Sequence, residues 1–399
     1  MAINLAVIVI ICLFLDSVLK RLRLPGLLGM LAVGIVAGPY VLDLLSPELI
    51  SVSADFRRIA LIVILLRAGM KTNAATLRRV GRRSLLLSFL PALVEGTAVF
   101  LVAHPLLGLP RLEAAILASI VAAVSPAVVV PSMIGFMDRR LGTAKGIPSM
   151  LLAGSAGDNV FAIVVFGVAM GIYSGSGGSV AAQLARIPVS IALGIFLGLL
   201  AGYAWYRIFE RYRLAGKKVL LLIGTAIVMT WLEDNLAPVL PLASLLGVMT
   251  LGFIILEKSE EVAHRISDAL GRVWVFAEIL LFVLVGAQVN IHVVWKAGLA
   301  GTAVIAVGLA FRSLGTWTSV LGSDLNGRER LFTVISYLPK ATVQAAIGAI
   351  PLSMGVPGGE VILAVAVLSI LLTAPAGAVA ILFAGERLLE PERHGPGRT

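Results

Sequence analysis

The sequence predicts an all-α polytopic membrane protein with about thirteen transmembrane helices. Of its 399 residues, 59% are hydrophobic and 14% are charged, whereas soluble domains are about 45–50% apolar and about 25% charged. Apolar runs approaching the roughly 20 residues that cross a bilayer recur along the whole chain. Lys and Arg gather in alternate connections between these runs. The net charge of +10 therefore indicates membrane topology rather than nucleic-acid binding.

The predicted spans follow one another with short connections. The first run lacks the basic start and the small-residue cleavage site of a signal peptide, so we interpret it as a retained span. The third span is short. In chain order the spans cover residues 2–19, 26–44, 57–70, 84–103, 112–136, 149–173, 181–206, 218–233, 237–256, 273–291, 296–321, 330–353 and 357–385.

The connections predict the orientation of the chain. Because basic connections remain in the cytoplasm, we expect an odd number of spans, with the N-terminus outside and the C-terminus inside. The single cysteine, Cys12, excludes an intrachain disulfide. No connection carries a nucleotide-binding glycine pattern, and no motif combines a nucleophile, a base and an acid, so we expect neither an ATPase nor an enzyme. The basic connections are residues 20–25, 71–83, 137–146, 207–218, 257–272, 322–330 and the C-terminal tail.

Prolines predict broken helices at two related places. Pro126 and Pro131 lie in the fifth span, and Pro339 lies in the twelfth. Proline removes a backbone donor and interrupts the helical hydrogen bonds. These spans hold the same position in two sets, spans 1–6 and 8–13, which have opposite orientation. Interrupted helices at matching positions of inverted repeats indicate a midplane site in a secondary transporter, although proline kinks are also common in membrane helices.

Four ionisable residues fall within the apolar part of the chain. They are two acids and two bases, Glu95, Asp158, Arg312 and Lys340. Each costs at least about 2.5–3.5 kcal/mol at the centre of a bilayer, so each should face protein or water and have a partner. The four charges can neutralise one another, but their spacing leaves the pairing open.

Several strings through most of the chain resemble the monovalent cation/proton antiporter superfamily, in its branch with two adjacent aspartates. They include "LPGLLGMLAVGIVAGP", "VSPAVVVPSM", "DNVFAIVVF" and "YLPKATVQAAIGAI". The resemblance implies one exchanger domain over residues 1–399 that forms a homodimer in the lipid bilayer. A scaffold of about residues 1–70 and 218–291 would hold a core of about 84–173 and 296–385. The core, with two crossing broken helices, would carry the ion by an elevator motion.

The resemblance also implies roles for the buried polar residues. Asp158 matches the first aspartate, and Asn159 replaces the second, so this pair would bind a monovalent cation transiently. Glu95 and Arg312 match a structural ion pair. Lys340 would then lie near Asp158 as a charge partner, or offset helix-end dipoles. From their positions, Ser125 and Ser155 are candidates for supplementary oxygen ligands, with helix packing as the alternative.

Asn159 sets the expected chemistry. Its carbonyl can bind a cation, but an amide cannot take up a proton in the physiological range. One acid, Asp158, then predicts exchange of one H⁺ for one Na⁺, K⁺ or Li⁺, which is electroneutral. We expect no cofactor, and a location in a cell membrane, bacterial or archaeal. The alternatives are a transport-silent sensor or structural relative, a transporter of another solute on the same fold, and a passive channel.

Overall fold

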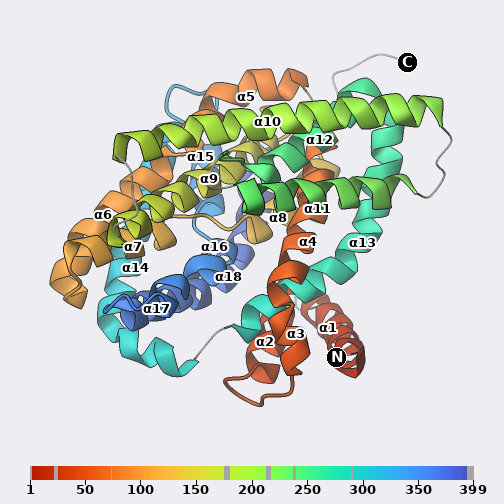
Figure 1. Cartoon of the computed structure of the whole chain (residues 1–399). Helices are drawn as coiled ribbons and strands as arrows, with labels where there is room; N and C mark the ends of the chain where they lie inside the picture. The colour runs from red at the N-terminus through yellow and green to blue at the C-terminus, as the bar shows by residue number, and fades with distance from the viewer. Residues whose placement is uncertain are drawn as a thin grey trace.

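The computed structural model describes residues 2–21, 26–72, 74–174, 180–212, 217–236, 240–288 and 291–392. Within these ranges the regular structure is helical, apart from one antiparallel bridge between Leu141 and Pro391. The N-terminal helices lie at the bottom of Figure 1, and α10 crosses its top. The first nine helices are α1 (Ala2–Arg21), α2 (Gly26–Ala37), α3 (Pro47–Ser51), α4 (Ser53–Gly69), α5 (Ala74–Leu87), α6 (Leu90–Leu107), α7 (Arg111–Val121), α8 (Pro126–Asp138) and α9 (Ile147–Tyr173).

The second half of the chain is also helical. Helix α14 is interrupted at Gly298, which has a positive φ of 50°. The remaining helices are α10 (Val180–Arg211), α11 (Lys218–Leu236), α12 (Ser244–Lys258), α13 (Glu260–Ala287), α14 (Ile291–Ser319), α15 (Gly327–Ser336), α16 (Thr342–Ile347), α17 (Ile350–Ser353) and α18 (Gly359–Leu388).

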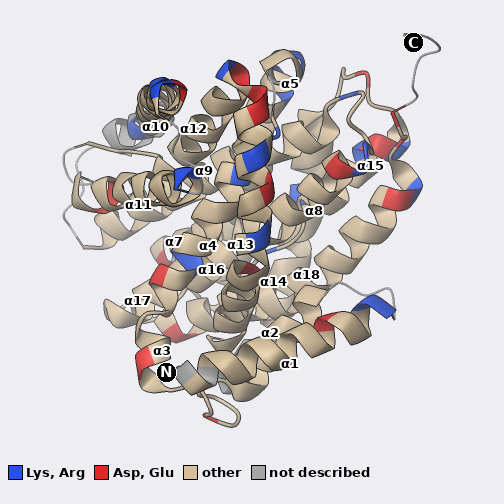
Figure 2. Ribbon diagram, turned by 90° about the vertical axis from the view of Figure 1, so that its right-hand side faces the viewer, with Lys and Arg blue, Asp and Glu red and all other residues tan. Residues whose placement is uncertain are grey.

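The helices fit a multi-pass membrane protein. In the described part of the chain, eight helices are long and apolar enough to cross a membrane. Leu, Ile, Val and Phe side chains are exposed on many of them, as expected for surfaces that face lipid. Figure 2 shows Lys and Arg mainly toward the end that carries α5 and α15. The prediction of an all-helical polytopic membrane protein is confirmed.

Two of the predicted basic connections are themselves helical. Most of residues 71–83 form α5, and most of residues 257–272 form the first half of α13. The helices extend beyond the apolar runs because Arg, Glu and Ala are good helix formers. Hydropathy therefore locates the apolar part of a helix, but it does not locate the end of the helix.

Small residues bring the helices of one packed group close together. Helices α2, α4, α12 and α13 pack against one another. A Cβ atom at Gly34 of α2 would lie 2.1 Å from the carbonyl oxygen of Val283, and one at Gly286 of α13 would lie 2.3 Å from that of Leu31. Close backbone contact at glycine is typical of membrane helix pairs. Larger residues at Gly34 and Gly286 would force α2 and α13 apart.

A second packed group contains the interrupted helices. Helix α6 packs against α7 and α14, α9 contacts α5, α7 and α8, and α18 contacts α7, α8, α14 and α15. Helix α4 contacts α8, and α10 contacts both α9 and α12, so the two groups touch. The division into a scaffold and a moving core stays a prediction. The candidate site lies inside the second group.

Candidate functional site

Two helix interruptions meet inside the second group. Residues 122–125 separate α7 from α8, and residues 337–341 separate α15 from α16. Pro126 is the first residue of α8, where the missing N–H costs nothing. Pro339 lies within the second interruption. The N–H of Ser125 donates to the carbonyl of Pro339 at 2.8 Å, so the two non-helical segments are joined directly.

Pro131 does not break its helix. It lies inside α8, which continues to Asp138. This corrects the expectation that Pro131 helps to break the span. In the second turn of α8 it removes a single intrahelical hydrogen bond, which the helix on both sides tolerates. The break occurs before Pro126 instead.

Side chains from three other helices, α9, α14 and α16, satisfy the backbone of the first interruption and the end of α7. Gln344 Nε2 donates at 2.9 Å to the carbonyls of both Ile120 and Ala123. An Arg312 nitrogen, Nη1, donates to the carbonyl of Ala122. The N–H of Val124 donates to Asp158 Oδ2 at 2.8 Å. Non-helical backbone at membrane depth is tolerated where protein supplies such partners.

The four buried charges form one network. Arg312 Nη1 lies 2.8 Å from Glu95 Oε2, and Arg312 Nη2 lies 3.1 Å from Asp158 Oδ2. Lys340 Nζ lies 2.8 Å from Glu95 Oε1. All four side chains have no exposed surface. Two acids and two bases sum to zero charge, which is the condition under which ions can be buried at a tolerable cost.

The pairing differs from the one expected for Lys340. Glu95 and Arg312 lie together as an ion pair, but the direct partner of Asp158 is Arg312 rather than Lys340. The ammonium of Lys340 contacts Glu95. The fork of the guanidinium reaches two carboxylates at once, whereas the ammonium acts as a point charge. Arg312 therefore bridges the acids, and Lys340 completes the neutralisation of Glu95.

Several buried oxygen atoms at the two interruptions have no hydrogen-bond partner in the described part of the chain. They include Asp158 Oδ1, Asn159 Oδ1 and Ser125 Oγ. Unpartnered buried oxygens require an explanation, and an ion or a water supplies one. Ser155 is also buried, and its hydroxyl donates to the carbonyl of Leu152 at 3.1 Å, which leaves its lone pairs free. The residue types at this place suit a small hard cation.

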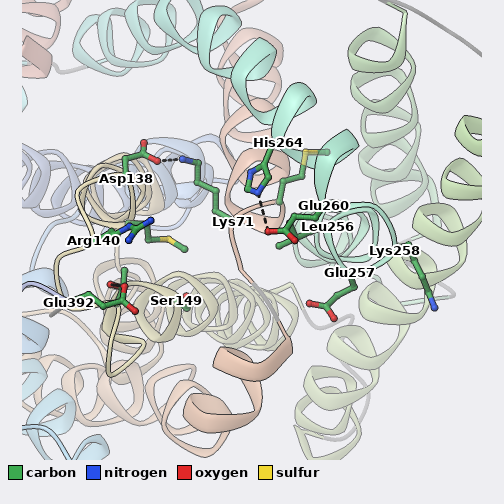
Figure 3. A pocket seen from close by; sticks show the side chains of 13 residues that line it. Lys71, Asp138, Arg140, Ser149, Leu256, Glu257, Lys258, Glu260, His264 and Glu392 are labelled. Atoms are coloured by element: carbon green, nitrogen blue, oxygen red, sulfur yellow. Dashed lines mark hydrogen bonds and ion pairs between the residues drawn. The ribbon is translucent and has the colours of Figure 1, made fainter. Parts of the chain in front are cut away.

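A charged cavity of about 830 Å³ opens between the two packed groups (Figure 3). Lys71 follows α4 and forms an ion pair with Asp138 at the end of α8 across the cavity. Arg67 Nη2 lies 3.6 Å from the same carboxylate. Ser149 lines the cavity from α9. At a rise of 1.5 Å per residue, Ser149 lies about 13 Å along α9 from Asp158.

Sequence reasoning missed three residues that support the site. Thr373 Oγ1 accepts the N–H of Lys340 at 2.8 Å. The carbonyl of Tyr337 accepts from Arg312 Nε, and the guanidinium lies 5.3 Å from the centre of the Tyr337 ring. Gln344 holds the carbonyls described above. Tyr337 and Gln344 belong to the "YLPKATVQAAIGAI" string. They carry no charge, so the search for ionisable residues in apolar spans did not identify them.

Comparisons with known proteins agree on the family. Residues 5–384 match the family model described as "Sodium/hydrogen exchanger, transmembrane". The chain is 33% identical over 386 residues to sodium/hydrogen exchanger 9B2 of Homo sapiens, covering 93% of this chain and 71% of that protein. It is 32% identical over 386 residues to the Mus musculus protein of the same name, covering 93% and 70%.

A solved structure shares the fold. The sodium proton antiporter MjNhaP1 from Methanocaldococcus jannaschii, determined at pH 8, superposes with a TM-score of 0.79. The superposition covers 96% of each chain at 19% sequence identity. This likeness shows a common helical architecture, independently of the sequence matches.

Proposed function

The chain belongs to the sodium/hydrogen exchanger family, as the sequence resemblance predicts, and we propose that it is a secondary active antiporter that exchanges H⁺ for a monovalent cation, Na⁺ first. The observation that carries this proposal is the hydrogen bonding of the two carboxylate oxygens of Asp158. Its Oδ2 atom is held by Val124 and Arg312, while Oδ1 is buried and free of hydrogen bonds. A proton and a cation would compete for that free oxygen.

The proposed exchange is electroneutral. Asp158 would be the single titrating ligand, with Asn159 and Ser125 as neutral oxygen ligands beside it. Arg312 cannot release its proton, and Glu95 is already neutralised by two cationic side chains. One proton bound at Asp158 would thus replace one monovalent cation, and no net charge would cross the membrane.

The proposed architecture has thirteen spans in two inverted repeats, with the N-terminus outside. The alternating basic connections support this orientation. A scaffold containing α2, α4, α12 and α13 would form a homodimer in a cell membrane, bacterial or archaeal, while the second group moves as an elevator. The charged cavity between the groups supports this division, because it would give water and ions access toward Asp158 from one side.

The test is proton flux into proteoliposomes under an imposed pH gradient, with Na⁺, K⁺ or Li⁺ added in turn. We expect Asp158→Asn to abolish the cation-dependent flux. Asp234→Asn is a matched control, because that carboxylate is half exposed and pairs with Arg58 away from the site. Undiminished flux in Asp158→Asn would falsify the assignment.

A transport-silent relative is the second candidate. The replacement of an acid by Asn159 and the ion pair between Arg312 and Asp158 favour it, since both reduce the negative charge available to a cation. An inert wild type together with an inert Asn159→Asp variant supports the silent relative. Cation-dependent flux in the wild type supports the antiporter, and flux that appears only in Asn159→Asp shows an exchange site that the amide silences.

A further inference from the structure

We infer that Gln344 is a positioning residue, which holds the peptide unit between Ala123 and Val124 so that its N–H points at Asp158. The inference rests on the proposed function and deepens it. Gln344 is 1% exposed and comes from α16, beyond the second interruption. Its side-chain nitrogen donates at 2.9 Å to the carbonyl of Ala123 and at 2.9 Å to that of Ile120.

The end of α7 needs such a donor. The last carbonyls of a helix have no partner within the helix. Here they are buried, so water cannot replace the missing donors: Ile120, Val121 and Ala123 have no exposed surface. The carbonyl of Ala122 is taken by Arg312. Gln344 supplies the shorter hydrogen bond to the carbonyl of Ala123, at 2.9 Å against 3.5 Å from the charged Lys340 Nζ, and it also supplies the donor for Ile120.

The planarity of the peptide bond carries the effect to Asp158. The carbonyl of Ala123 and the N–H of Val124 belong to one rigid unit and point in opposite directions. Gln344 fixes the carbonyl at one end, and the N–H at the other end donates to Asp158 Oδ2 at 2.8 Å. Hydrogen bonds linked in this way polarise one another. Gln344 therefore stabilises the ionised form of a carboxylate that it does not touch.

This link predicts a change in the pH dependence of exchange. A hydrogen bond to a carboxylate favours its charged form. When the donor from Gln344 is lost, the peptide unit can rotate and protons compete better for Asp158. A hydrogen bond to a charged group corresponds to about one pH unit. The pH of half-maximal exchange should rise by about that amount, and the apparent KM for the cation should rise at a fixed pH.

The experiment compares two substitutions at the same position with one elsewhere. Gln344→Met keeps the length of the side chain and removes the donor. Gln344→Glu can donate only when it is protonated, so its exchange should fall below that of wild type increasingly as the pH rises. Gln288→Met is the matched control, because Gln288 lies at the end of α13, outside the network.

The first readout is the pH profile of cation-dependent proton flux, and the second is amide hydrogen exchange of residues 120–125. We expect Gln344→Met to move the pH midpoint with the maximal rate largely kept, and to speed hydrogen exchange in that segment. A residue that only supports folding would lower the maximal rate without moving the midpoint. An unmoved midpoint in an active protein overturns the inference.

The second readout separates the inference from the proposed function. An inert wild type overturns the proposed antiport, but hydrogen exchange at residues 120–125 still reports on the peptide unit. In that case unchanged exchange in Gln344→Met overturns the positioning role, and faster exchange that is absent in Gln288→Met supports it.

Discussion

The guanidinium of Arg312 joins Asp158 to Glu95, with its two terminal nitrogens 3.1 Å and 2.8 Å from the two carboxylates. Helix α14 is thereby tied to α9 and to α6. The same guanidinium donates to the carbonyls of Tyr337 and Ala122, one in each interruption. One side chain thus connects both breaks with both acids, and this relationship determines how variants of the network should behave.

Arg312→Met should destabilise the protein strongly. It leaves two buried acids with only Lys340, and an uncompensated buried charge costs about 3–5 kcal/mol. Thermal unfolding in detergent measures the loss. Arg58→Gln breaks an exposed ion pair with Asp234 and should cost less than about 1 kcal/mol.

The double variant Glu95→Gln with Arg312→Met should recover part of that loss. It removes an acid together with the base, so the remaining charges of Asp158 and Lys340 balance. Replacing both members of a buried pair is far less costly than removing one. A double variant no more stable than Arg312→Met would contradict the view that charge balance, rather than packing of the guanidinium, dominates here.

The positions of the apolar helices follow from the sequence, but the contacts of the site do not. Long apolar runs locate α9 and α18, and Pro126, the first residue of α8, marks the interruption. The presence of four buried charges is also visible. Their pairing is not, because Glu95 and Arg312 are separated by 217 residues and meet only through the packing of α6 on α14.

The neutral side chains and backbone groups of the site were even harder to identify from the sequence. Gln344 has no charge to mark it, and the N–H of Val124 has no side chain to read. Both become visible only when the interruption is seen in three dimensions. The helix α5 was missed for another reason, since its arginines interrupt the apolar pattern although they favour a helix.

Asp324 gives a pH-dependent contribution to stability outside the spans. Partial burial raises the pKa of Asp324, but hydrogen bonds from Arg79 and Arg83, both at 2.7 Å, outweigh it and lower that pKa below its ordinary value. The folded state then binds this proton less tightly than the unfolded state does. The resulting stability is present above the unfolded pKa of about 3.9 and is lost as the pH falls through the folded value.

Asp324→Asn should therefore lower the free energy of unfolding at pH 7 by about 1 kcal/mol or less, because the ion pair is partly exposed. The unfolding temperature should fall slightly. The difference from wild type should shrink as the pH falls below about 4. Thermal scans across this range measure it. Asp268→Asn is the control, because Asp268 is exposed and has no ion pair in the described part of the chain. A difference that stays constant as the pH falls below about 4 would argue against the ion pairs as its source.

The ion pair between Lys71 and Asp138 should tie the two walls of the charged cavity together (Figure 3). Asp138→Lys places like charges opposite each other. Their repulsion should hinder the proposed movement of the second packed group against the first and so lower the rate of exchange. The swap of Lys71→Asp with Asp138→Lys restores opposite charges and should recover the rate in part, because Arg67 also faces this position. A swap as slow as the single variant would show that the pair has no coupling role.

Asn159→Asp should convert an electroneutral exchanger into an electrogenic one. The new carboxylate adds a second proton-binding group beside Asp158, in a side chain that is only 9% exposed. Two protons would then be released for each monovalent cation bound, so one net charge would move in each cycle.

The measurement compares Na⁺-dependent proton flux with and without a membrane potential clamped at zero by valinomycin and K⁺. In wild type the clamped and unclamped fluxes should be similar. In Asn159→Asp the clamped flux should be clearly faster than the unclamped flux. Asn235→Asp, on an exposed side chain at the end of α11, controls for added acid elsewhere. Potential-sensitive flux in the wild type would mean that a group other than Asp158 also carries a proton, and Lys340 would be the first to test.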